Sequence, residues 1–148
     1  MPPRKERCRV VLDTNVVVSY ILLRRSRSAA SRIFTLWYKQ HHLQLIISDE
    51  VIAEYYEVLE CVGADERRVE QLYNLLQRAS IVTRVNLGAR HAISRDPDDD
   101  VLLATAAAGQ AHFLITNDHD LLDIPLAQKR RFRFEILTPG AFLARWEQ

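Results

Sequence analysis

The sequence contains little glycine, proline, cysteine or lysine. Four Gly and five Pro in 148 residues indicate neither a low-complexity tract nor a linker. The two cysteines, Cys8 and Cys61, cannot form a zinc site by themselves, and we expect free thiols in a reducing compartment. Only three of the 20 basic residues are Lys, and the net charge of +1 excludes the strongly basic surface of a histone-like protein.

Long apolar runs are also missing. No run reaches the roughly 18 residues that a membrane span requires. The apolar stretch after the basic N-terminus is interrupted at Asp13, which argues against a secretory signal. We therefore expect a cytoplasmic protein with no membrane contact. A length of 148 residues and a hydrophobic content of 48% predict a single domain over residues 1–148 with a buried core.

Charge is distributed unevenly along the chain. Seven Asp and no Lys or Arg occur between Asp96 and Asp123. Basic residues form three clusters outside this stretch: Arg4, Lys5, Arg7 and Arg9; Arg24, Arg25 and Arg27; and Lys129, Arg130, Arg131 and Arg133. The near-neutral net charge therefore conceals separate acidic and basic regions.

Hydrophobic periodicity predicts strands that alternate with helices. The predicted strands are 8–12, 43–47, 81–85, 113–116 and 134–137. The predicted helices are 28–40, a helix capped by Ser48, 65–79, 98–109 and a closing helix from Thr138 through Trp146. This alternation indicates an α/β fold in which a parallel sheet is covered by helices on both faces. Ligands of such folds bind beyond the carboxyl ends of the strands, near the reversal of strand order.

Carboxylates occur where such a site is expected. Asp13 follows the first strand directly, and Asp118 comes shortly after the strand at 113–116. Asp100 lies near the start of the Ala-rich helix, and Glu54 lies on the apolar side of the helix capped by Ser48. Two carboxylates about 5 Å apart repel by roughly 3 kcal/mol at an effective dielectric constant of 20, so we expect a cation between them. Ligands that are all oxygen favour Mg²⁺ or Mn²⁺ over zinc.

Each acid also has an alternative structural role. Asp13 alone is more often a turn or helix-capping residue. Asp98 and Asp99 are typical of a helix N-terminus, where they complement the helix dipole. Glu54 is compatible with a partly exposed helix position. The presence of at least three acids, in the order that one site requires, favours a shared site over these separate roles.

Four segments carry these acids in order along the chain. They are VVLDTNVVVS at 10–19, SDEVIAEYYEVL at 48–59, DPDDDVLLATAAAG at 96–109 and FLITNDHDLL at 113–122. They resemble the signature segments of PIN-domain nucleases, and in particular the PIN toxins of bacterial toxin–antitoxin systems. The resemblance implies a three-layer α/β/α sandwich with a central, mainly parallel sheet. It also implies Mg²⁺- or Mn²⁺-dependent hydrolysis of RNA, an antitoxin protein as partner, and a homodimer.

The resemblance also assigns roles to individual residues. The catalytic acids that it implies are Asp13, Glu54, Asp100 and Asp118. Asp13, Asp100 and Asp118 are the expected metal ligands, and Glu54 is expected to help hold the metal or to orient the attacking water. The expected auxiliary residues are Thr14, Asn15, Thr116 and Asp120.

A basic surrounding is needed for RNA to approach an acidic pocket. Arginine suits this purpose, because its guanidinium group pairs with phosphate through two hydrogen bonds. We therefore predict that the cluster after the first segment binds substrate: Arg24, Arg25 and Arg27.

Three other functions are weighed against a nuclease. A signalling receiver domain requires paired acids after its first strand, whereas Leu12 precedes a lone Asp13. A haloacid-dehalogenase-like phosphatase requires a second Asp where Asn15 stands. The alternative that stays open is a catalytically weak PIN fold that binds RNA or protein. Metal dependence of RNA cleavage separates this alternative from the nuclease.

Overall fold

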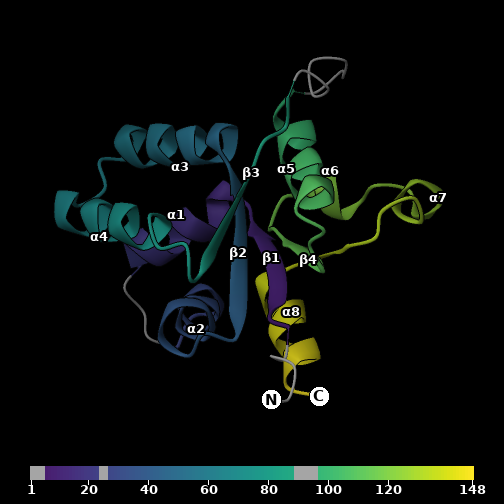
Figure 1. Cartoon of the computed structure of the whole chain (residues 1–148), viewed down its shortest axis with the longest axis horizontal. Helices are drawn as coiled ribbons and strands as arrows, with labels where there is room; N and C mark the ends of the chain where they lie inside the picture. The colour runs from purple at the N-terminus through teal and green to yellow at the C-terminus, as the bar shows by residue number, and fades with distance from the viewer. Residues whose placement is uncertain (1–5, 24–26, 89–96) are drawn as a thin grey trace.

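A sheet of five parallel strands forms the centre of the structure (Figure 1). The structure, a computed structural model, describes residues 6–23, 27–88 and 97–148, with the backbone alone for 97–100. The strand order is β3-β2-β1-β4-β5. The strands are β1 (Cys8–Leu12), β2 (Leu43–Ser48), β3 (Val82–Val85), β4 (Phe113–Ile115) and β5 (Glu135–Leu137). Each strand predicted from the sequence is present, with boundaries within one residue.

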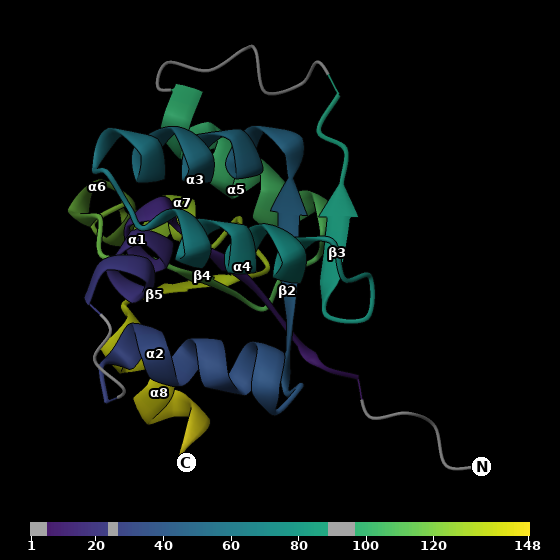
Figure 2. The ribbon, with the colours of Figure 1, turned by 90° about the vertical axis from the view of Figure 1, so that its left-hand side faces the viewer.

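Helices cover both faces of this sheet, and the predicted three-layer α/β/α arrangement is confirmed. The helices are α1 (Thr14–Leu23), α2 (Ala29–Phe34), the π-helical turn η1 (Thr35–Lys39), α3 (Asp49–Cys61), α4 (Glu66–Leu76), α5 (Pro97–Ala108), α6 (His119–Leu122), α7 (Leu126–Lys129) and α8 (Pro139–Trp146). Figure 1 shows α1, α3 and α4 on one side of the sheet and α5 on the other. Figures 1 and 2 place α2 beside α8, near the end of the sheet where β2 begins. None of the described helices is long and apolar enough to cross a bilayer.

Polar side chains fix the starts of three predicted helices. The hydroxyl groups of Ser28, Ser48 and Thr138 accept hydrogen bonds from backbone N–H groups three residues further on. These bonds satisfy N–H groups that have no partner within a helix. Capping residues therefore locate α2, α3 and α8 directly from the sequence.

Two other helices depart from the sequence pattern. The helix predicted over 65–79 is wrong at its end: α4 stops at Leu76, because the chain must turn before β3. Ile81 and Val82 both donate backbone hydrogen bonds to Arg78 O in that turn. The pattern does not predict α1, because its β-branched residues have modest helix propensity. Burial of Val16 and Val17 in the core, where α1 packs against α2 and α3, stabilises that helix instead.

The core lies on both faces of the central strands. Val11 of β1, Ile46 of β2 and Leu114 of β4 have no exposed surface. Continuous apolar strands are expected when helices cover both faces of a parallel sheet. This rigid centre holds the carboxyl ends of β1 and β4 side by side, with Leu12 opposite Ile115.

Candidate active site

Asp13 lies where the strand order reverses. The chain leaves β1 towards β2 on one side and returns to β4 on the other, so a crevice is expected beyond the carboxyl ends of β1 and β4. The backbone N–H of Asp13 donates a 2.9 Å hydrogen bond to Ile115 O, which joins the two strand ends. The residue is 7% exposed. The structure therefore places Asp13 at the edge that the sequence predicts.

Three donors hold the carboxylate of Asp13. Its Oδ1 accepts a 2.6 Å hydrogen bond from Thr14 N–H. Its Oδ2 accepts bonds from Thr116 Oγ1 at 2.5 Å and from Asn15 Nδ2 at 3.3 Å. Burial raises the pKa of Asp13 and these bonds lower it, while the negative charge of Asp118 raises it; the net direction is upward. The three hydrogen bonds thus orient the carboxylate, while burial and the charge of Asp118 disfavour its ionised form.

Thr116 connects Asp13 to Asp118. The Thr116 hydroxyl donates to Asp13 and accepts a 2.9 Å hydrogen bond from the backbone N–H of Asp118. Asp118 is half-buried, and its Oδ1 accepts a 2.9 Å bond from Asp120 N–H as the cap of α6. A carboxylate with one such bond keeps acceptor capacity for a cation. Asp118 therefore combines a capping role with its predicted position beside Asp13.

Tyr55, the residue after Glu54 in α3, is fixed to the carboxyl end of β1. The Tyr55 hydroxyl is fully buried and donates a hydrogen bond to Leu12 O, one residue before Asp13. Burial raises the pKa of Tyr55, and the charges of Asp13 and Glu54 raise it further. Both acids therefore act on one phenol group. Tyr55 is not among the site residues predicted from the sequence, although a tyrosine in place of phenylalanine at a buried position is a signal of such a polar role.

A buried chain of hydroxyl groups positions α5 against α3. Thr105 Oγ1 donates a 2.6 Å hydrogen bond to Val101 O. Ser48 Oγ is therefore the donor in the 2.9 Å hydrogen bond between Ser48 Oγ and Thr105 Oγ1. Ser48 Oγ in turn accepts from Val51 N–H. Thr105 is not among the site residues predicted from the sequence, although a single hydroxyl group within the Ala-rich segment is a visible signal. Asp100 belongs to the first turns of α5, and its side chain lies outside the described residues.

The side chains at this edge present carboxylate and hydroxyl oxygens, the atom type that a hard divalent cation prefers. Asp13 and Asp118 are close enough for one charge to raise the pKa of the other. The buried Thr14 Oγ1 has no hydrogen-bond partner within the described part of the chain. Among the residues with described side chains, no group of three or more His, Cys, Asp or Glu side chains is arranged to hold a metal ion. The third predicted ligand, Asp100, is not part of that set.

The remaining predicted residues differ in their relation to Asp13. Thr14 and Asn15 contact it directly, whereas the exposed Asp120 contributes its backbone N–H to Asp118. Arg27 is exposed and follows the far end of α1, a helix of ten residues that is about 15 Å long. Arg24 and Arg25 lie outside the described residues.

The family is decided by a comparison with known protein families. The sequence model of the PIN domain matches residues 9–120, a range that includes Asp13, Glu54, Asp100 and Asp118. The chain belongs to the PIN domain family. PIN domains are generally nucleases and typically use divalent metal ions.

A solved structure supports the same fold. VapBC2 from Rickettsia felis, bound to a DNA fragment from its promoter, is similar to this PIN domain with a TM-score of 0.57 and 18% sequence identity. The match covers 86% of this chain and 96% of the other. At this identity the likeness establishes the fold. A comparison with curated proteins gives no match.

Proposed function

We propose that the protein is a metal-dependent endoribonuclease and the toxin of a toxin–antitoxin pair. The observation that carries the proposal is the arrangement of Asp13: a nearly buried carboxylate at the strand switch, held by three donors beside a second carboxylate. Such a group is costly without a counter-charge, and a cation at this position provides one. Membership of the PIN family supports the nuclease class.

In the proposed mechanism, Asp13, Asp100 and Asp118 hold Mg²⁺ or Mn²⁺. When bound, the ion supplies Lewis-acid stabilisation of the scissile phosphate and lowers the pKa of water. Thr116 and Asn15 keep the Asp13 carboxylate in one orientation through their hydrogen bonds. Glu54 orients the attacking water or accepts its proton. Arg24, Arg25 and Arg27 contact the RNA outside this pocket.

The proposed partners are RNA, a cognate antitoxin and a second copy of the chain, all in the cytoplasm. VapBC2, the similar solved structure, is a complex bound to promoter DNA, which supports an antitoxin partner. Leu22 and Leu23 at the end of α1 and Tyr73 on α4 are 45%, 55% and 51% exposed. These side chains are accessible to a protein partner.

The decisive experiment compares two Asp→Asn variants in cleavage of a labelled single-stranded RNA. Asp13→Asn removes the oriented carboxylate, and we expect at least about a 100-fold loss of Mn²⁺-dependent cleavage. Asp49→Asn is the matched control, because Asp49 is an exposed acid in the first turn of α3. We expect this control to retain wild-type activity. Cleavage that persists in excess EDTA contradicts the proposal.

A thermal melt tests the metal ligands independently of activity. Mn²⁺ that binds the folded state stabilises it by RT ln(1 + [L]/Kd). We expect Mn²⁺ to raise the Tm of the wild type and of Asp49→Asn, and to raise that of Asp13→Asn or Asp100→Asn much less. An unchanged Mn²⁺ response in Asp100→Asn excludes Asp100 as a ligand.

A further inference from the structure

A concave site lies at the amino edge of the sheet, opposite the edge where Asp13 lies. It has a volume of about 480 Å³ and is lined by Arg9, Gln110, His112 and residues 131–134, and by Ala106 and Ala107 of α5. We infer that this amino-edge pocket binds a nucleotide unit of single-stranded RNA. The inference rests on the proposed function for its class of ligand, and adds a contact remote from the acids.

The position of the pocket follows from the parallel sheet. Arg9 belongs to β1, His112 precedes β4 and Phe134 precedes β5, so the lining comes from the starts of three adjacent strands. Asp13 follows the other end of β1. Three strand residues lie between Arg9 and Asp13, and the four steps from one to the other span about 13 Å. An RNA molecule with one nucleotide in the pocket therefore leaves the acidic edge accessible to its other nucleotides.

Two phenylalanines provide a surface for a base. The rings of Phe132 and Phe134 are stacked, with centroids 4.9 Å apart and planes inclined by 9°. Phe134 is buried, whereas Phe132 is partly exposed and lines the pocket. A ring fixed on one side by a buried neighbour is suited to stack a base on its other side.

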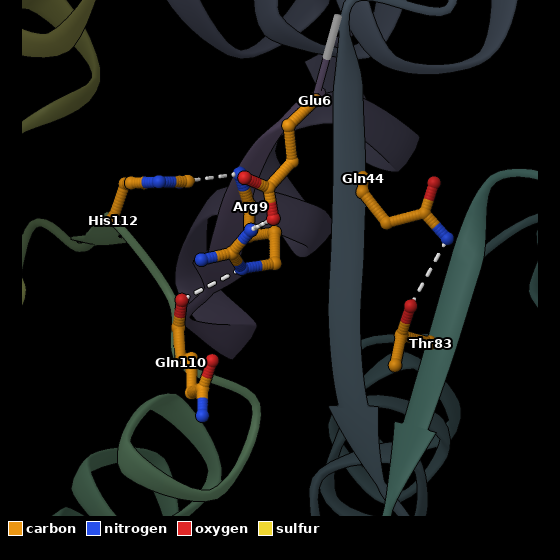
Figure 3. A network of polar contacts seen from close by, with 6 residues as sticks. All are labelled: Glu6, Arg9, Gln44, Thr83, Gln110 and His112. Atoms are coloured by element: carbon orange, nitrogen blue, oxygen red, sulfur yellow. Dashed lines mark hydrogen bonds and ion pairs between the residues drawn. The ribbon is translucent and has the colours of Figure 1, made fainter. Parts of the chain in front are cut away.

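Arginines on either side of Phe132 supply charge for a phosphate. Arg131 and Arg133 are exposed, and neither forms an ion pair with any residue that the structure describes. Among the side chains that the structure describes, no acidic group lines the pocket. Arg9 is already engaged, because its guanidinium donates to Glu6 and, at 2.7 Å, to Gln110 O (Figure 3). Arg131 and Arg133 are therefore the guanidinium groups that remain for a phosphate.

His112 adds a directed hydrogen-bond donor. Its Nδ1 accepts a 2.9 Å hydrogen bond from the backbone N–H of Arg9 (Figure 3). A neutral imidazole that accepts at Nδ1 carries its hydrogen on Nε2. Because His112 lines the pocket, Nε2–H is placed to donate to a phosphate or a base edge.

A neighbouring groove gives room for more than one nucleotide. It has a volume of about 910 Å³, shares His112 and Arg133 with the pocket, and is also lined by Arg7, His42 and Trp146. Its two acids are neutralised: Glu6 pairs with Arg9, and Glu135 pairs with Arg145 through bonds of 2.9 and 3.0 Å. Aromatic rings interleaved with unpaired cations match single-stranded RNA better than an acidic peptide, which offers no bases to stack.

The test is the binding of a fluorescein-labelled ten-nucleotide single-stranded RNA, measured by anisotropy in EDTA. We expect Arg131→Ala and Arg133→Ala each to weaken binding at least about threefold and to reduce the slope of log K against log salt by about 0.7. We expect Phe132→Leu to weaken binding at least about fivefold with an unchanged salt slope, because a lost stack removes no charge. Arg130→Ala is the matched control, because Arg130 is exposed in the same run but does not line the pocket; we expect a change under about twofold.

Three results overturn the inference. Equal weakening by all three Arg→Ala variants shows diffuse attraction in place of a pocket. Unchanged binding in Arg131→Ala and Arg133→Ala excludes RNA from the pocket. Both arginines are exposed, so these two variants still test the inference if Phe132→Leu fails to fold. Displacement of RNA by a polyglutamate peptide that requires Arg131 and Arg133 assigns the pocket to an acidic protein segment. Because binding is measured in EDTA, Mn²⁺-dependent cleavage by the wild type reports separately on the proposed function.

Discussion

The two edges of the sheet carry opposite chemistry, although the same strands form both. At the carboxyl edge, Asp13 and Asp118 come directly before α1 and α6, and Asp13 is almost completely buried. At the amino edge, Arg9 donates to Gln110 O just beyond the end of α5, and Arg131, Arg133 and His112 there are exposed. Helix N-termini favour anions and helix C-termini favour cations. The winding of a parallel α/β fold therefore accounts for part of the charge segregation seen along the sequence.

The difference in burial is as informative as the difference in sign. Buried carboxylates must be oriented and neutralised, so their neighbours are specified in detail, as the three donors to Asp13 illustrate. Exposed cations need no such partners, because water solvates them and they remain adaptable. Catalysis requires side chains held in one orientation, as at the carboxyl edge. Binding of a flexible RNA strand requires only exposed, adaptable cations, as at the amino edge.

After the loss of Asp13 itself, the largest expected effect at the acidic edge is the loss of the Thr116 hydroxyl group. Thr116→Val deletes the donor to Asp13 Oδ2 and leaves the backbone N–H of Asp118 without its acceptor. Because both acids lose their orientation, we expect a fall of about 10- to 100-fold in kcat/KM for RNA cleavage. Thr116→Ser keeps the hydroxyl and is expected to retain most of the activity. Equal loss in both variants contradicts a hydrogen-bonding role.

The next effect concerns the attachment of α3 to the carboxyl edge. Tyr55→Phe removes the hydrogen bond to Leu12 O and leaves a buried carbonyl unsatisfied. We expect the free energy of unfolding in urea to fall by about 1–3 kcal/mol. Glu54 also loses part of its positioning, so RNA cleavage should decrease as well. Unchanged stability indicates that water replaces the phenol hydroxyl at this site.

The pH dependence of stability sharpens the electrostatic part of the comparison. The folded-state pKa of Asp13 lies above its ordinary value of 3.8, chiefly because of burial. The folded protein therefore binds this proton more tightly than the unfolded chain does. The resulting stabilisation is fully present below pH 3.8 and is lost as the pH rises through the raised pKa. Urea unfolding of the wild type in EDTA should show this decline across the acidic range, whereas Asp13→Asn should lack it. Identical pH profiles refute the raised pKa.

How far the sequence predicts this molecule depends on whether a signal is local. Strand ends and helix caps follow from short patterns, and the structure confirms both. The position of Asp13 directly after β1 follows from the same kind of pattern. The bonds from Tyr55 to Leu12 and from Ser48 to Thr105 join residues 43 and 57 positions apart, and no local pattern encodes them. The amino-edge pocket has the same origin, because its lining meets only when β1, β4 and β5 are adjacent. From the sequence alone, the basic run at 129–133 is therefore typical of a solvated loop, and only the fold shows that part of it lines a pocket.

The smallest expected effect on stability comes from His112, which mirrors Tyr55 at the other end of β1. Both side chains bond the backbone of that strand: Tyr55 donates to Leu12 O in the core, and His112 accepts from Arg9 N–H at the surface. His112→Ala leaves a backbone N–H that water can solvate, so we expect the free energy of unfolding to change by no more than about 0.5 kcal/mol. RNA binding in EDTA should nevertheless weaken, since the Nε2–H donor is lost from the pocket. Urea unfolding and anisotropy on one variant therefore separate the two roles. A loss of stability as large as that of Tyr55→Phe shows that the amino edge is as tightly built as the carboxyl edge and removes the contrast between them.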